Sequence, residues 1–328
     1  MGRRVWLGLL LLLLGACAPS LEKYSVLPVA EPPQGEVGVA FLGVSTLLID
    51  DGDTRIMVDG FFTRPGKLKT LFGRIKPDEH VIAPALDKYR ARPLAAVVTL
   101  HSHHDHAMDA PLVAKLGGGA TLIGSESTRM IRDGLGIDVP FEAAEPGKAR
   151  AFGKFKLTLL KASHSKQSSW VSAPGHLTAP LKPPVRFNDY LEGGAYALLV
   201  EHGPRRLLVL GSAGLIKAEQ SYKADVVFLA IGGLGREKGD VPRDLWNNAV
   251  VGSQAKRVIP THWDDFTRPL SKPLQPFPWP FDDVPKALDD LCARAGGKIE
   301  VVLPPVGIRF DPFVRLPDPA AACEAGKP

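Results

Sequence analysis

The stretch that decides the fold is Pro93-Leu94-Ala95-Ala96-Val97-Val98-Thr99-Leu100-His101-Ser102-His103-His104-Asp105-His106. Its first eight residues are apolar and β-prone, so they predict a buried strand. The six that follow hold four side chains able to bind metal, in the pattern H-x-H-x-D-H. A strand that ends in a loop of ligands holds metal geometry fixed and leaves room for substrate. The stretch therefore predicts a metal site at the carboxyl end of a strand.

The spacing of the motif favours two cations. His101 and His103 are two residues apart, so on an extended chain they point to the same side. Asp105 and His106 follow one residue later, where the chain must turn. Imidazole and carboxylate suit zinc and its neighbours, so we expect zinc, with iron and manganese as the alternatives. Two cations about 3.5–4 Å apart can hold a bridging hydroxide.

Five segments of the chain, in order, resemble the metallo-β-lactamase-fold hydrolases over about residues 37–310. They are residues 39–50 with 55–60, the motif at 101–106, His164 after a β-prone run, residues 207–214, and His262 in Pro260-Thr261-His262-Trp263. The resemblance implies an α/β fold, a four-layer αββα sandwich of two packed mixed β-sheets flanked by helices. The hairpin at 196–210 is most similar to the group that holds lactonases and phospholipase-D-like phosphodiesterases.

The same resemblance implies the site. One metal would be held by His101, His103 and His164, and the other by Asp105, His106 and His262. Asp105 would also be catalytic by orienting the hydroxide. Asp59, which ends a strand, would buttress the ligand loop through a hydrogen bond, because ligand histidines need partners that fix their tautomer; a strand-end turn residue is the alternative. The remaining histidines in question are expected to face away (His104) or to be surface or loop residues (His80, His176 and His202).

Ser212 departs from the family pattern, because most relatives have a bridging aspartate there. A hydroxyl is a poor bridge between two cations. Three interpretations are open: the second site is weak or empty, a hydroxide alone bridges, or Asp264 or Asp265 supplies the carboxylate. We favour two metals bridged by hydroxide.

The amino terminus predicts export. Arg3 and Arg4 precede an apolar run, and Leu14-Gly15-Ala16-Cys17 resembles a bacterial lipobox. We expect a signal peptide at 1–16, a lipidated Cys17, and a Pro-rich tether to residue 35. Ala18 after the cysteine favours the outer membrane, with the protein facing the periplasm. The alternative is a plain signal peptide with an incidental cysteine.

Composition sets the organisation. The 40 basic and 35 acidic residues give a net charge of +5 without a basic run, so no nucleic-acid partner is expected. One hydrolase domain is expected at 36–316, with a helix at 110–116, a second half that begins near Arg186, and a tail at 317–328. Cys292 and Cys323 could form a disulfide that fixes the tail.

The expected activity is metal-dependent hydrolysis at the cell envelope. A metal-bound hydroxide would attack an ester, a phosphodiester or a lactone, and the substrate would be a small molecule or a lipid. The alternatives are a β-lactam-hydrolysing enzyme, which the six ligands with Ser212 keep open, and a non-catalytic metal-binding envelope protein. The loop from Ser165 to Pro184, with Trp170, Pro174 and Leu181, is expected to line the pocket.

Overall fold

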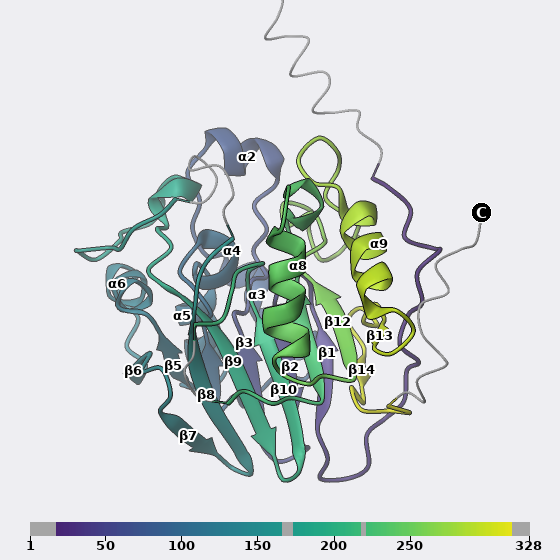
Figure 1. Cartoon of the computed structure of the whole chain (residues 1–328). Coiled ribbons are helices and arrows are strands. Elements are labelled where there is room, and N and C mark those ends of the chain that lie inside the picture. Colours follow the sequence, from purple (N-terminus) through teal and green to yellow (C-terminus); the bar gives the residue numbers. More distant parts are fainter. Residues whose placement is uncertain (1–17, 166–172, 218–220, 317–328) are drawn as a thin grey trace, which may run out of the picture.

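The computed structural model describes residues 18–165, 173–217 and 221–316. Two seven-stranded sheets pack face to face, and helices cover their outer faces (Figure 1). The expected αββα sandwich of two mixed sheets is confirmed. The predicted signal peptide, the lipidated Cys17, the tail at 317–328 and the Cys292–Cys323 pairing involve residues outside the described ranges. No helix within those ranges is long and apolar enough to cross a membrane.

The first sheet has the strand order β14-β1-β2-β3-β4-β5-β6. Neighbours from β14 to β3 pair antiparallel, and those from β3 to β6 pair parallel. The predicted strand before the motif is β4, and it is buried completely, because Ala96 and Val98 pack in the core between the sheets and Val97 packs on the outer face. Its strands are β1 (Gly38–Phe41), β2 (Leu47–Asp50), β3 (Arg55–Val58), β4 (Ala96–Val98), β5 (Thr121–Gly124), β6 (Phe141–Ala143) and β14 (Arg309–Phe310).

The second sheet has the strand order β13-β12-β11-β10-β9-β8-β7. Because β7 and β8 belong to it, the prediction that the second half begins near Arg186 is wrong: its sheet begins at Ala149. The antiparallel hairpin of β7 and β8 pairs with β9 across a long loop. Its strands are β7 (Ala149–Phe152), β8 (Phe155–Ala162), β9 (Ala195–His202), β10 (Arg205–Leu210), β11 (Val226–Ala230), β12 (Arg257–Thr261) and β13 (Glu300–Val301).

Side-chain alternation along the strands separates two apolar layers. In β2, Leu47 and Ile49 pack in the core between the sheets, and Leu48 packs on the outer face. Successive side chains of a strand point to opposite faces, so both faces of this buried sheet need apolar residues. The outer face is covered by α3 (Glu79–Lys88) and α5 (Ala110–Leu116), and α5 has the bounds predicted from the sequence.

The other helices complete the outer layers. On the first half lie α2 (Lys67–Phe72), α4 (His104–Ala107) and α6 (Glu126–Gly134). On the second half lie α8 (Val241–Leu245), the π-helical η3 (Trp246–Val251) and α9 (Val284–Ala295), with the short 3₁₀ turn η2 (Leu234–Arg236). The 3₁₀ turn η1 (Phe187–Asp189) lies between β8 and β9 in the chain, and its Phe187 packs beside the first half, against His104. The ends of α9 follow from local chemistry, because the Asp283 side chain accepts a hydrogen bond from Lys286 N, and Gly296 takes the left-handed conformation after the last turn.

The segment expected to be a flexible tether differs from the prediction. Leu27 is buried, and Leu21 and Tyr24 pack against the core between the sheets. The hydroxyl of Tyr24 donates hydrogen bonds to Asp289 and to the carbonyl of Pro285. Apolar residues spaced through this Pro-rich segment explain the difference, because their burial against the domain offsets the entropy of ordering the chain.

Candidate metal centre

The motif leaves β4 and turns at once into α4. The turn is fixed by Ser102, whose backbone N–H donates to the carbonyl of Glu192 and whose hydroxyl lies 2.6 Å from the carbonyl of Leu191. The Leu100 N–H donates to Asp59 Oδ1 at 2.8 Å. These bonds satisfy backbone groups that leave the sheet inside the protein, where an unpaired polar group is costly.

The first donor group consists of His101, His103 and His164. Their ligand atoms lie within 4.8 Å of one another. His101 and His103 come from the loop after β4 in the first sheet, and His164 follows β8 in the second. The structure therefore brings together the three histidines that the family resemblance assigned to one site.

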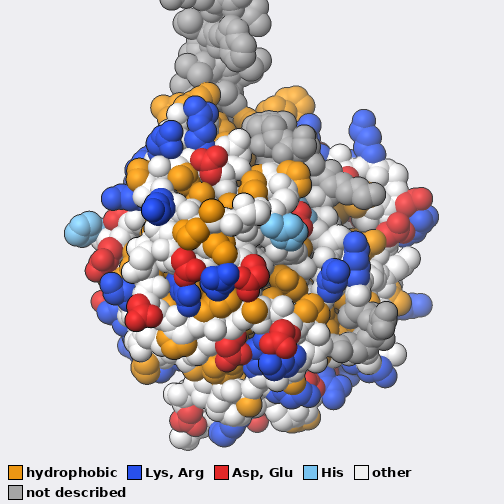
Figure 2. All heavy atoms as spheres, turned by 90° about the vertical axis from the view of Figure 1, so that its left-hand side faces the viewer, with side chains coloured by type: hydrophobic (Ala, Val, Ile, Leu, Met, Phe, Trp, Pro, Cys, Tyr) orange, Lys and Arg blue, Asp and Glu red, His pale blue; other side chains and the backbone are white. Residues whose placement is uncertain are grey.

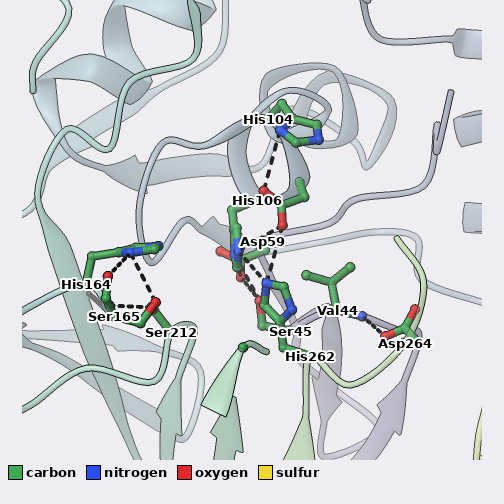
Figure 3. A network of polar contacts seen from close by, with 12 residues as sticks. Val44, Ser45, Asp59, His104, His106, His164, Ser165, Ser212, His262 and Asp264 are labelled. Carbon is green, nitrogen blue, oxygen red and sulfur yellow. Dashed lines mark hydrogen bonds and ion pairs between the residues drawn. The ribbon is translucent and has the colours of Figure 1, made fainter. Parts of the chain in front are cut away.

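The second donor group consists of Asp105, His106 and His262, again within 4.8 Å of one another. Asp105 and His106 lie on α4, and His262 follows β12 (Figure 3). His262 Nε2 lies 3.3 Å from Asp105 Oδ2 and 3.3 Å from His106 Nε2. Gly232 gives this ring its space, because a Cβ there would lie 2.7 Å from His262 Nδ1.

The donor atoms suit cations. Both ring nitrogens of His101 and Nε2 of His103 are buried and have no hydrogen-bond partner among the described residues. A buried polar atom without a partner is costly, and a cation would satisfy these nitrogens. Burial lowers the pKa of His101 well below 6.5, the pKa of His103 to about 3 and the pKa of His164 to about 4. The three imidazoles are therefore neutral at pH 7, as metal binding requires.

The second group carries negative charge. Burial by itself would raise the pKa of Asp105, but the neighbouring His106, His104 and His262 lower it well below its usual value. Burial would lower the pKa of His262, but the hydrogen bond with Asp105 and the charge of Asp105 raise it. The ionised Asp105 therefore favours positive charge beside His262, which a cation in this group would supply.

Asp59 supports His106 as the resemblance implied. Its Oδ2 lies 2.8 Å from His106 Nδ1, and it also accepts a hydrogen bond from the hydroxyl of Ser45 (Figure 3). With Nδ1 carrying the proton toward Asp59, Nε2 of His106 is left as a donor atom facing Asp105 and His262. Ser45 was not anticipated, and nothing in its local sequence indicates this contact.

Ser212 lies beside the first donor group. Its hydroxyl accepts a hydrogen bond from Ser165 N at 3.0 Å and donates one to the Ser165 hydroxyl at 3.3 Å. His164 Nδ1 lies 3.0 Å from the Ser165 carbonyl, so this pair fixes the tautomer that leaves Nε2 of His164 unprotonated (Figure 3). Ser212 thus contacts the backbone that orients a ligand, and it belongs to neither donor group.

Neither acidic alternative for the bridging position lies in a donor group of the described residues. Asp264 accepts a hydrogen bond from Val44 N and pairs with Arg64 at 2.7 Å. Asp265 accepts hydrogen bonds from Thr267 and pairs with Lys67 at 3.1 Å. The structure therefore contradicts the hypothesis that one of these carboxylates is a ligand. The missed feature is the Arg64–Asp264 pair, whose partners are 200 residues apart.

Backbone strain gathers around the two donor groups. Val44, Asp59, Arg64 and His262 have positive φ angles of 41–57°. Such conformations cost roughly 1–3 kcal/mol each and persist where the surroundings determine them. Two of these residues are joined directly, because His262 N donates to the Val44 carbonyl at 2.7 Å. The loop after β1 therefore positions a ligand from the second sheet.

The other histidines divide as follows. His104 is buried among Phe61, Phe187 and Phe266 and lies in neither donor group, in keeping with its predicted phase. His80 and His176 are exposed, as expected. The prediction for His202 is wrong: it is buried on β9, with Nε2 3.1 Å from Asp51 Oδ2, because the alternation along the strand turns it inward.

A cavity of about 430 Å³ opens over both donor groups. Its wall is largely apolar, and two basic side chains, Lys67 and Arg236, reach it. From the loop at 165–184, Ser165 and Ala173 line it, whereas Pro174 is exposed and Leu181 packs in a separate apolar cluster. Trp170 lies outside the described residues. The aromatic part of the wall comes instead from elsewhere in the chain: Phe72, Phe187, Phe266, Phe277 and Phe281.

Known proteins resemble this chain in sequence and fold. A UPF0173 metal-dependent hydrolase of Cupriavidus necator is 27% identical over 248 residues, covering 70% of this chain and 77% of that protein. A UPF0173 metal-dependent hydrolase of an Exiguobacterium species is 25% identical over 248 residues, covering 74% of this chain and 92% of that protein. The solved structure of Igni18, a metallo hydrolase of the archaeon Ignicoccus hospitalis, has a TM-score of 0.50 at 16% sequence identity. The match covers 84% of this chain and 98% of that chain, and it shows a similar fold alone. The model of the metallo-beta-lactamase superfamily matches residues 39–204, about half of the chain, and the chain belongs to that superfamily.

Proposed function

We propose that this chain, a metal-dependent hydrolase by family, holds two zinc ions and cleaves an ester, phosphodiester or lactone bond. One ion would be held by His101, His103 and His164, and the other by Asp105, His106 and His262. The relatives named metal-dependent hydrolases support the reaction type. The observation that carries the proposal is the pair of adjacent donor groups with buried, unpartnered imidazole nitrogens beneath one cavity.

A bound zinc ion supplies two things: it lowers the pKa of water to about 7 and it polarises the bond under attack. The side chains of the protein orient the water and hold the ligands. Asp105 is ionised and faces the cavity, so its carboxylate can accept a hydrogen bond from the attacking water and orient it. Asp59 and the Ser165 carbonyl fix the tautomers of His106 and His164. The apolar wall limits competing water.

The cavity indicates the class of substrate. A wall dominated by aromatic and aliphatic side chains suits a substrate with a large apolar part. Lys67 and Arg236 reach the cavity, and so do the acidic residues Glu237 and Asp282, so the charge of its lining outside the donor groups is mixed. The donor groups contribute a single carboxylate, Asp105, so two divalent ions would leave the centre strongly positive and favour an anionic group. These features favour an amphiphilic phosphodiester or ester.

The place of action that we propose is the cell envelope. Cys17 would carry the lipid anchor, and the domain would face the periplasm from the outer membrane. The support is the sequence Leu14-Gly15-Ala16-Cys17 after an apolar run. Replacing Cys17 with Ser should release the protein from membranes, and retention of that variant in the membrane pellet would contradict lipidation.

Metal analysis paired with a substrate panel tests the activity. Natively purified protein should contain about two zinc equivalents and should hydrolyse bis-p-nitrophenyl phosphate or p-nitrophenyl esters. His101→Ala and His262→Ala should each lose about one equivalent and most of the turnover, whereas the exposed His80→Ala should match the parent. Nitrocefin in the same panel tests the β-lactam alternative that Ser212 favours. Protein that binds no divalent metal, or turnover that survives chelation, would contradict the proposal.

A further inference from the structure

Three apolar side chains stand out from the surface. Trp279, Phe72 and Leu68 are 69%, 65% and 61% exposed, more than any other large apolar side chain of the described residues. Leu68 and Phe72 are four residues apart on α2, so they share one side of that helix. Exposed apolar residues scattered singly are ordinary, but a contiguous group marks an interaction surface.

These three residues, which we name the apolar rim, border one opening. Leu68 and Phe72 line the cavity over the metal centre, and Trp279 lies between Phe277 and Phe281, which line it too. In Figure 1, α2 and the loop before α9 lie along the same upper edge of the sandwich. Figure 2 shows hydrophobic side chains gathered at this edge. Two residues of the rim therefore line the cavity over the metal centre, and the third belongs to the loop that supplies two phenylalanines to its wall.

The segments that carry the rim are basic. Residues 67–76 contain two lysines before Thr70, then Arg74 and Lys76, and no acidic residue. Residues 266–281 contain Arg268 and Lys272 and no acidic residue. Asp264, Asp265, Asp282 and Asp283 directly flank the second segment, and Lys67 pairs with Asp265, so the excess of basic residues is confined to these two segments. Exposed tryptophan beside lysine and arginine is the composition of a membrane interface with anionic lipid.

The chain enters the domain at the same edge. Ala18, the first described residue, lies in a depression that it shares with Lys67, Arg268 and Pro278. Cys17 directly precedes it, and one residue spans less than about 4 Å. A lipid on Cys17 would therefore be attached beside the cavity entrance. Because residues from Leu21 onward pack on the domain, no long tether separates that anchor from the rim.

We propose that the apolar rim inserts into the surface of a phospholipid bilayer, with its basic neighbours on anionic headgroups, so that the cavity opens toward the lipid. The consequence for substrate, which rests on the proposed hydrolase function, is that the enzyme takes amphiphiles directly from the bilayer. The apolar wall receives the acyl part, and the charged head reaches the metal centre.

Fluorescence quenching by brominated lipids tests the docking. The full-length protein, purified with the processing that the cell has carried out, is reconstituted in vesicles. The vesicles contain phosphatidylcholine and phosphatidylglycerol that are brominated on the acyl chains. We expect the bromine to quench part of the tryptophan emission of the parent, and Trp279→Phe to remove that part. Leu68→Ser with Phe72→Ser should reduce the quenching at least several-fold. Val251, 53% exposed at the opposite end of the sandwich before β12, provides the control: Val251→Trp should add no quenching.

The outcomes separate docking from catalysis. His262→Ala should keep the full quenching, because the rim does not depend on the metal centre, so an inactive protein can still confirm the docking. Equal quenching of parent and Trp279→Phe, or added quenching in Val251→Trp, would overturn it. If docking holds and lipid esters are hydrolysed no faster in vesicles than when dispersed in detergent, the direct uptake of amphiphiles is wrong and the docking stands.

Discussion

Replacing Arg64 with Met should destabilise the protein more than any exposed charge substitution. Arg64 Nη1 lies 2.7 Å from Asp264 Oδ2, and both side chains are 0% exposed. A Cβ on Gly43 would lie 2.1 Å from Arg64 Nη2, so the pair is tightly enclosed. Methionine fills much of the space of arginine, but it leaves the carboxylate of Asp264 buried with the Val44 N–H as its one remaining hydrogen-bond donor among the described residues. An uncompensated buried charge is what makes this substitution costly.

The magnitude follows from the burial. Removing one partner of a fully buried pair costs about 3–5 kcal/mol, against a total stability of about 5–15 kcal/mol for a typical domain. At about 2–4 °C per kcal/mol, the midpoint of thermal unfolding should fall by the order of 10 °C. Lys67→Met is the comparison, because its ion pair with Asp265 is 41% exposed on the lysine side and such pairs contribute about 1 kcal/mol or less.

A double substitution makes the test sharp. The double variant Arg64→Met, Asp264→Asn has no buried charge at this site, and the amide oxygen of the asparagine can still accept a hydrogen bond from Val44 N. Chemical denaturation should therefore show the double variant to be more stable than Arg64→Met alone. Arg64→Met should also weaken metal binding at the second donor group, because the Val44 carbonyl accepts from His262 N. A loss below about 1 kcal/mol for Arg64→Met, or a double variant less stable than the single one, would refute the reasoning.

The other predictions concern the metal centre and its surroundings. Asp59→Asn should lower metal affinity about 10–100-fold, measured by competition with a chromogenic chelator, because His106 loses its charged partner. Burial raises the pKa of Asp109 to about 6, so the native carboxyl keeps a proton that the unfolded chain releases near pH 4. The free energy of unfolding should therefore fall by about 3 kcal/mol as the pH rises from about 4 to about 6. Urea denaturation at a series of pH values measures this slope, and Asp109→Asn should flatten it. Removing metal with a chelator should lower the midpoint of thermal unfolding. The loss of stability should be about 4 kcal/mol if the free metal concentration before chelation was 1,000 times the Kd. Ser212→Asp should raise affinity for the second equivalent, and an unchanged second equivalent in elemental analysis would count against it.

Local patterns predicted the fold where local chemistry decides it. The apolar run before the motif is the buried strand β4, and the helix at 110–116 has the bounds expected. The membership of strands in sheets was harder to predict. β7 and β8 precede the long loop, yet β8 pairs with β9 beyond it. Such pairing depends on contacts between distant residues, which no local periodicity encodes.

The donor residues were predictable and their supports were not. A histidine at a strand end, in the family order, predicts a ligand, and the six chosen side chains do come together. Asp264 is two residues after His262 in the sequence, which made it a candidate ligand. Its carboxylate instead pairs with Arg64. Sequence proximity cannot distinguish these roles, because the partner that engages Asp264 is 200 residues away in the chain.

Each donor group joins the two sheets, and this explains why the centre needs strained supports. His101 and His103 belong to the first sheet and their partner His164 to the second; Asp105 and His106 likewise meet His262 across the sandwich. A cation in either group would therefore cross-link the halves, and any relative shift of the sheets would separate its ligands. The hydrogen bond from His262 N to the Val44 carbonyl opposes that shift at the ligand itself. Protein interiors are close-packed and do not deform continuously, so holding the two sheets together at this edge also fixes the positions of the donor atoms. The apolar rim lies outside this contact and stays free to insert into the bilayer.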